Sequence, residues 1–121
     1  MSNALLNLTT VLDGPNYQIW TRQMSAYLQS VELWLVTDGT YTEPVAADPQ
    51  NPTDAETEAI NKWNNTNLKA LGTITLRLSP AIADATLVIL NAHTLWTHLE
   101  AQYGRVSPAR VFELYKKTHT F

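Results

Sequence analysis

The sequence predicts an all-α fold, a compact bundle of about five or six helices. Large apolar residues recur at steps of three and four in separate stretches of the chain, which is the spacing of one face of an α-helix. Helix-start signals precede several of these stretches. The apolar run 87–90 resembles a strand by itself, but no partner strand is evident elsewhere, so we expect a buried connector there.

The first periodic stretch predicts a core helix held in place by aromatic rings. Its large apolar residues are three or four apart and share one helical face: Tyr17, Trp20, Met24 and Leu28. Gly14-Pro15 interrupts the chain just before them. Asn16 can cap the first turn, although Pro15 could instead be the first helical residue. The leucine-rich lead-in, residues 1–13, fits either a short helix or an extended arm that docks onto this helix.

Two less regular segments follow the first helix. Residues 31–36 either continue it or form a second short turn. Residues 37–52 contain prolines and no periodic pattern, and a connection of this length is often functional or mobile. Its carboxylates are scattered along the segment. We interpret it as either a plain surface loop or a contact loop.

The next two helices have clear start signals. Thr53 and Glu56 have the spacing of a capping box, and the apolar pattern after them predicts one long helix from about residue 54 to 78. Ser79-Pro80 then combines a cap with a proline at the first helical position, which predicts a short helix.

The last part of the chain predicts two more helices. One is expected from about residue 91 to 103, where the following Gly104 suits the left-handed residue that often ends a helix. The other begins at Ser107-Pro108 and reaches Phe121 without a stop signal, so the sequence looks cut at this end. The residues predicted to form the structural core are Tyr17, Trp20, Met24, Leu28, Trp63, Leu71, Ile74, Trp96, Leu99 and Tyr103.

No grouping of residues indicates catalysis, so we predict no catalytic, cofactor-binding or metal-ligating residues and no enzymatic activity. His93 and His98 are five residues apart and face different sides of a helix, whereas a zinc pair needs a spacing of four. The glycines are isolated, unlike those of a phosphate-binding loop. The chain has no cysteine, which excludes disulfides, thiol catalysis and thiolate metal sites.

Composition and charge narrow the possible environments and partners. With 45% hydrophobic and 16% charged residues, the 121-residue chain is typical of a soluble globular domain. A net charge of −3 argues against strong nucleic-acid binding. The apolar runs are too short to cross a bilayer, and residues 1–12 lack the features of a signal peptide. We therefore expect a cytoplasmic protein without membrane association.

Four short motifs occur in order between residues 12 and 103. They are Leu12-x-Gly14-x-Asn16-Tyr17-x-x-Trp20-x-x-x-Met24-x-x-x-Leu28, then Trp34 five residues before Gly39, then Trp63 ahead of a helix with Ala70, Ile74 and Leu78, and then Trp96-x-x-Leu99-x-x-x-Tyr103. In this order and at these distances they resemble the Gag proteins of copia-type LTR retrotransposons.

The resemblance implies a structural capsid protein that assembles with itself into virus-like particles enclosing the element's RNA. Residues 1–104 would be a helical domain similar to the N-terminal domain of retroviral capsids. Residues 105–121 would be a linker and the start of the next helix, in a truncated C-terminal capsid domain. The chain lacks a zinc knuckle and a long basic tail, so RNA would bind only through regions outside it.

The resemblance also implies weak self-association of this fragment alone, because a shell of many copies needs only modest individual contacts. Candidate contact elements are the arm at 4–12, the loop at 37–52 and the helix after Pro108. One alternative function is a host-domesticated Gag-derived adaptor or scaffold that binds protein partners through a groove between helices. Another is a small helical enzyme or ligand carrier, which would require a deep polar pocket.

Overall fold

The computed structural model describes residues 3–104, and within them the chain is entirely helical apart from turns and loops. The helices are α1 (Asn3–Asn7), α2 (Tyr17–Ser30), α3 (Trp34–Asp38), α4 (Asp54–Thr75), α5 (Pro80–Ala85) and α6 (Ala92–Leu99), with a π-helical turn, η1 (Glu100–Gly104), directly after α6. The described residues contain no strand, only a single bridge between Leu12 and Leu78. The predicted all-α class and number of helices are confirmed.

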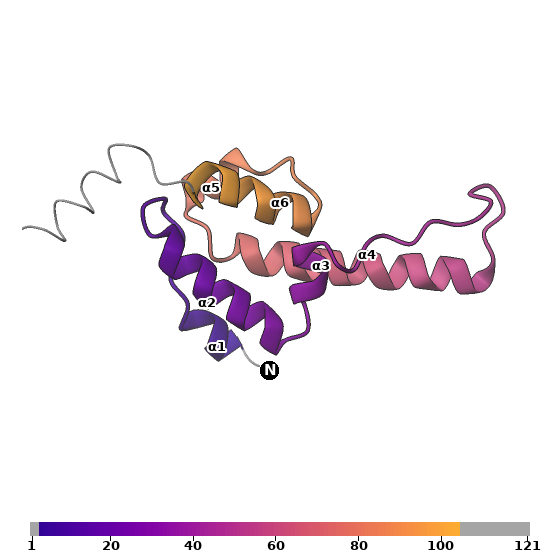
Figure 1. Cartoon of the computed structure of the whole chain (residues 1–121), viewed down its shortest axis with the longest axis horizontal. Helices are drawn as coiled ribbons and strands as arrows, with labels where there is room; N and C mark the ends of the chain where they lie inside the picture. Colours follow the sequence, from indigo (N-terminus) through magenta and orange to yellow (C-terminus); the bar gives the residue numbers. More distant parts are fainter. Residues whose placement is uncertain (1–2, 105–121) are drawn as a thin grey trace, which may run out of the picture.

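The longest helix, α4, organises the bundle. It packs against α3 and α6, while α2 packs against α3 and η1 (Figure 1). The N-terminal half of α4 projects beyond the rest of the molecule, and the segment between α3 and α4 runs beside it. The indole N–H of Trp63 donates to the Tyr41 carbonyl at 3.0 Å, and the Ala47 N–H donates to the Glu56 carboxylate at 3.0 Å. These bonds fix that segment along the projecting helix.

The N-terminal lead-in combines the two predicted conformations. It begins as the short helix α1 and continues as an extended arm. The Leu12 N–H donates to the Arg77 carbonyl, the Ser79 N–H donates to the Leu12 carbonyl, and both distances are 2.8 Å. Because Leu6 and Leu12 are buried in the core, the arm docks onto its own chain.

The predicted start signals of α4 and α5 are confirmed. The Thr53 hydroxyl accepts from the Glu56 N–H at 3.1 Å, and the Glu56 carboxylate accepts from the Thr53 N–H at 2.8 Å. The Ser79 hydroxyl accepts from the Ile82 N–H at 3.4 Å. Helix α4 ends at Thr75, earlier than the predicted residue 78, because the chain turns there to pair with the N-terminal arm.

The segment after α2 forms a separate helix, which decides between the two predicted alternatives for residues 31–36. Glu32 has a φ of 63°, a left-handed conformation that ends the regular helix. The chain then restarts as α3, which ends at Gly39 with a φ of 95°. A side chain at this position would also meet the His93 ring at 2.8 Å, so glycine is required twice over.

The roles predicted for two residues at helix termini are wrong in detail: one residue precedes α2 and the other ends η1. Asn16 precedes α2 but makes no side-chain cap; its amide donates to the Val11 carbonyl at 2.8 Å and accepts from the Asp13 N–H at 3.0 Å. Gly104 has no positive φ. Its Cβ would lie 3.2 Å from the Tyr17 ring, so the glycine permits close packing, not a left-handed turn. The predicted helix from 91 to 103 is α6 followed by η1.

The prediction that residues 87–90 form a buried connector is wrong. Leu87, Val88 and Leu90 are 75%, 85% and 72% exposed, and only Ile89 is partly buried against the core. The Leu87 N–H bonds to the Asp84 carbonyl and the Ile89 N–H to the Thr86 carbonyl, so tight turns follow α5. Successive side chains of such turns point in different directions, which leaves most of this run in solvent. The predicted helix after Pro108 lies outside the described residues.

Candidate functional site

The predicted core residues converge from α2, α4, α6 and η1 on one cluster. Leu71 and Tyr103 are partly buried and pack against its edge. The others are at most 8% exposed, namely Tyr17, Trp20, Met24, Leu28, Trp63, Ile74, Trp96 and Leu99. These side chains pack in the interior or against its edge, although Trp63 also borders a pocket of about 120 Å³ and Leu71 lines the groove described below.

The centre of the cluster is a group of aromatic rings. The rings of Trp20 and Trp96 are stacked, with centroids 5.4 Å apart and an interplanar angle of 30°. Trp34 meets Trp96 edge-on, also at 5.4 Å, and Tyr17 lies 5.9 Å from Trp20. Such offset and edge-to-face pairs add about 0.5–1.5 kcal/mol each beyond area burial. The aromatic group therefore ties α2, α3 and α6 together.

Arg77 holds the N-terminal arm and α2 against the end of α4, a role that the sequence did not predict. Its carbonyl accepts from the Trp20 indole at 2.9 Å and from the Leu12 N–H at 2.8 Å. Its guanidinium donates to the hydroxyl of Thr9 at 3.0 Å and also to the Thr9 carbonyl. Periodicity gave no signal for this role, because an arginine at a helix end is usually solvated.

The described residues contain no group of three or more side chains that could hold a metal ion. His93 bonds through Nδ1 to the Thr37 carbonyl at 3.0 Å and packs beside Gly39, so it joins α6 to α3. Burial raises the pKa of the Tyr17 phenol, and the Glu100 carboxylate adds to this rise, against a hydrogen bond with Thr21. The phenol is therefore held in its neutral form.

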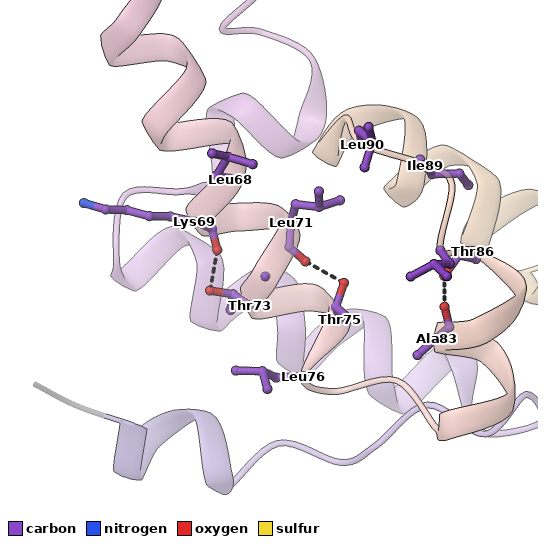
Figure 2. A pocket seen from close by; sticks show the side chains of 12 residues that line it. Leu68, Lys69, Leu71, Thr73, Thr75, Leu76, Ala83, Thr86, Ile89 and Leu90 are labelled. Carbon is purple, nitrogen blue, oxygen red and sulfur yellow. Dashed lines mark hydrogen bonds between the residues drawn. The ribbon is translucent and has the colours of Figure 1, made fainter.

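The most distinctive surface feature is an apolar groove between the C-terminal half of α4 and the α5–α6 region (Figure 2). Its volume is about 730 Å³. Residues on its two sides are largely exposed, including Leu68 at 60%, Leu76 at 69% and Leu90 at 72%. The complete lining is Leu68, Lys69, Leu71, Gly72, Thr73, Thr75, Leu76, Ala83, Thr86, Leu87, Ile89 and Leu90. The sequence analysis missed this groove because it placed 87–90 in the interior.

The comparisons with known proteins identify the family. The sequence pattern of the family described as gag-polypeptide of LTR copia-type matches residues 24–121. The chain belongs to this family. It is also similar to a retrovirus-related Pol polyprotein from transposon RE1 of Arabidopsis thaliana, with 27% identity over 116 residues, which cover 93% of this chain. No solved structure matches the chain at a significant level.

As a copia-type Gag polypeptide region, the chain is a non-catalytic domain. It spans only 8% of the length of the Arabidopsis relative, whose other parts lie outside this comparison. The interior of its described part consists mainly of aromatic and aliphatic side chains. No helix between residues 3 and 104 has the length and hydropathy needed to cross a membrane.

Proposed function

We propose that this chain is a capsid-forming part of Gag, and that it assembles with further copies into virus-like particles in the cytoplasm. The observation that carries the proposal is the family match over residues 24–121. The fold supports it, because a rigid, closely packed aromatic core suits a building block that is repeated many times in a shell.

The charge distribution is consistent with a shell that encloses RNA but does not bind the RNA through this chain. The whole chain has 11 acidic and 8 basic residues. The basic residues within 3–104 are dispersed along the sequence, at Arg22, Lys62, Lys69 and Arg77. Nucleic-acid binding depends on clustered cations that replace counterions on phosphates. The other four basic residues, Arg105, Arg110, Lys116 and Lys117, lie within 105–121, and the net charge of −3 of the whole chain opposes strong binding of RNA through them. We therefore assign RNA binding to regions of the full protein outside this chain.

The test is expression of the full-length Gag region followed by density-gradient sedimentation and nuclease treatment. The proposal predicts uniform particles that contain this domain and protect the element's RNA from nuclease. A matched deletion of residues 3–104 should abolish the particles while leaving the remaining protein soluble. Particles that form equally well without residues 3–104, or a full-length protein that stays unassembled, would refute the proposed role.

A further inference from the structure

The N-terminal arm, residues 3–12, is bound to the rest of the chain much as a receptor binds an extended peptide. Its end, Leu12, forms a bridge of two backbone bonds, each 2.8 Å long, with the turn after α4. Nearer its middle, the Thr10 N–H donates to the Gln23 side chain at 2.7 Å. Main-chain bonds to the peptide, together with pockets for alternate side chains, are how proteins recognise an added β-strand. The rest of the chain therefore forms an arm-binding site, whose polar contacts come from Gln23, Arg77 and Ser79.

Three side chains at a spacing of three residues anchor the arm. Leu6, Thr9 and Leu12 are 5%, 8% and 0% exposed. The Arg77 guanidinium donates to the Thr9 hydroxyl at 3.0 Å and also to the Thr9 carbonyl. The side chain of Leu8, between two anchors, points outward and is 76% exposed. The arm-binding site therefore selects a segment with a leucine, a threonine and a leucine at these positions.

The helical part of the arm is packed less closely than its end. A hollow of about 360 Å³ lies between α1 and α2, and Leu5, at its edge, is 53% exposed. Figure 1 shows α1 at the outside of the bundle, beside α2. The Thr10 hydroxyl is buried without a hydrogen-bond partner in the part of the chain that the structure describes, which opposes docking of the arm. These features lower the free energy needed to release the arm.

A short connector joins the arm to α2. Residues 13–16 belong to no helix. They include Gly14, whose φ of 120° only glycine adopts readily. Rotation at Gly14 moves the arm as a unit and leaves Tyr17, the first residue of α2, in place. The arm can therefore leave its site without unfolding of α2.

We infer that the N-terminal arm exchanges between copies of this chain, so that the arm-binding site of one copy takes the arm of a second copy. The inference rests on the proposed function, because assembly is what brings copies close together. The occupant is identified by the contacts that the structure shows at the site. A second copy carries the same anchors and forms the same backbone bonds, whereas another protein would need the same spacing of side chains.

Concentration decides between a chain's own arm and its neighbour's arm, because the arm contacts are the same in both arrangements. A short connector gives the chain's own arm an effective concentration in the millimolar range. Exchange should therefore involve about one chain in a hundred at about 10 µM and become comparable with self-docking at about 1 mM. Neighbouring copies held together in a shell are themselves at high local concentration, so assembly favours exchange. Reciprocal exchange between two copies gives a closed pair.

The experiment is thiol cross-linking between two 121-residue chains, since the wild-type chain has no cysteine. One chain carries Leu8→Cys on the arm, and the other, which is isotope-labelled, carries Ala26→Cys on α2. Both positions line the hollow between α1 and α2, so a flexible bismaleimide joins them when the arm is docked. A chain with both substitutions is the reference for docking within one copy. The matched control replaces Ala26→Cys with Val45→Cys, at a side chain that is 83% exposed and outside this hollow.

We expect the mixed pair at about 1 mM to give about tenfold more heterodimer, measured by mass spectrometry, than the control pair, and this excess to disappear at about 10 µM. Circular dichroism should show native folding of the cysteine variants, since Leu8 and Ala26 are exposed. Adding Arg77→Ala to the Ala26→Cys chain should reduce the yield, because it removes the bonds to Thr9 of the incoming arm.

The absence of excess heterodimer at about 1 mM, or a yield that Arg77→Ala leaves unchanged, would overturn the inference. So would a reference chain that forms no internal cross-link, because the arm would then not occupy the described site. Electron microscopy of the full-length Gag protein separates this inference from the capsid role. Particles that form although the 121-residue chain shows no exchange would leave the capsid role standing and the arm exchange wrong. Exchange in this chain without particles from the full-length protein would contradict only the capsid role.

Discussion

The indole N–H of Trp20 donates a hydrogen bond of 2.9 Å to the carbonyl of Arg77, a residue 57 positions later in the chain. The bond joins the first core helix, α2, to the turn that ends α4. The same turn receives the N-terminal arm through the Leu12 N–H. The N-terminal arm and α2 therefore both bond to the carbonyl oxygen of Arg77, a residue far from them in sequence.

Replacing Trp20 with alanine should destabilise the fold by about 3–5 kcal/mol, because the cavity adds to the lost transfer free energy of a fully buried ring. Urea denaturation measures this change. Trp20→Phe keeps an aromatic ring but removes the indole donor, so it should cost less than the alanine variant. An unchanged denaturation midpoint for Trp20→Ala would contradict the structural role of this residue.

Arg77→Ala should loosen the N-terminal arm, since the guanidinium bonds to Thr9 through both its hydroxyl and its carbonyl. Hydrogen bonds from a charged donor contribute about 1.5–3 kcal/mol, and the lower end is expected for this partly buried site. Amide hydrogen exchange should accelerate at Leu12 and Ser79, whose N–H groups form the bridge. The control Arg22→Ala, an exposed arginine on α2, should leave these amides unaffected. Equal amide exchange rates at Leu12 and Ser79 in the two variants would show that the Arg77 side chain does not hold the N-terminal arm in place.

Thr10→Val should stabilise the protein by about 1 kcal/mol, because it replaces a buried hydroxyl that has no hydrogen-bond partner with a methyl group. The matched control is Thr37→Val, which removes a buried hydroxyl bonded to the Leu33 carbonyl at 2.8 Å and should lower stability. Thermal unfolding of the two variants measures the difference. A loss of stability in Thr10→Val as large as that in Thr37→Val would show that the Thr10 hydroxyl is satisfied.

Glu56 makes the stability pH-dependent in the acid range. The N–H groups of Ala47 and Thr53 hold the pKa of its carboxyl below the usual value of about 4.5. The stabilisation is fully present above the unfolded pKa and is lost as the pH falls through the lower folded pKa. In Glu56→Gln this part of the acid dependence should disappear. An NMR titration of the Glu56 carboxyl checks the direction, and a folded pKa at or above that of the unfolded chain would contradict it.

The sequence predicts the helices well because local signals determine them. The capping box at Thr53 and the proline after Ser79 act within one turn, and the aromatic periodicity of α2 depends only on residues three or four apart. The family resemblance rests on four aromatic and apolar motifs between residues 12 and 103, and membership of the family is confirmed by the match over residues 24–121.

The features that the sequence did not predict depend on contacts between distant segments. The role of Arg77 requires the N-terminal arm to lie beside the end of α4. The packing of Gly104 on Tyr17 requires η1 to meet α2. The exposure of Leu87 and Leu90 depends on where α5 ends relative to α4, and a four-residue apolar run contains no information about that arrangement.

The most direct test of the capsid role is a cryo-electron microscopy reconstruction of particles made by the full-length Gag protein. The account predicts repeated shell density that fits residues 3–104, including the long projecting α4, at every lattice position. A well-resolved shell built entirely from other parts of the protein, with this domain absent from its lattice, would contradict the account.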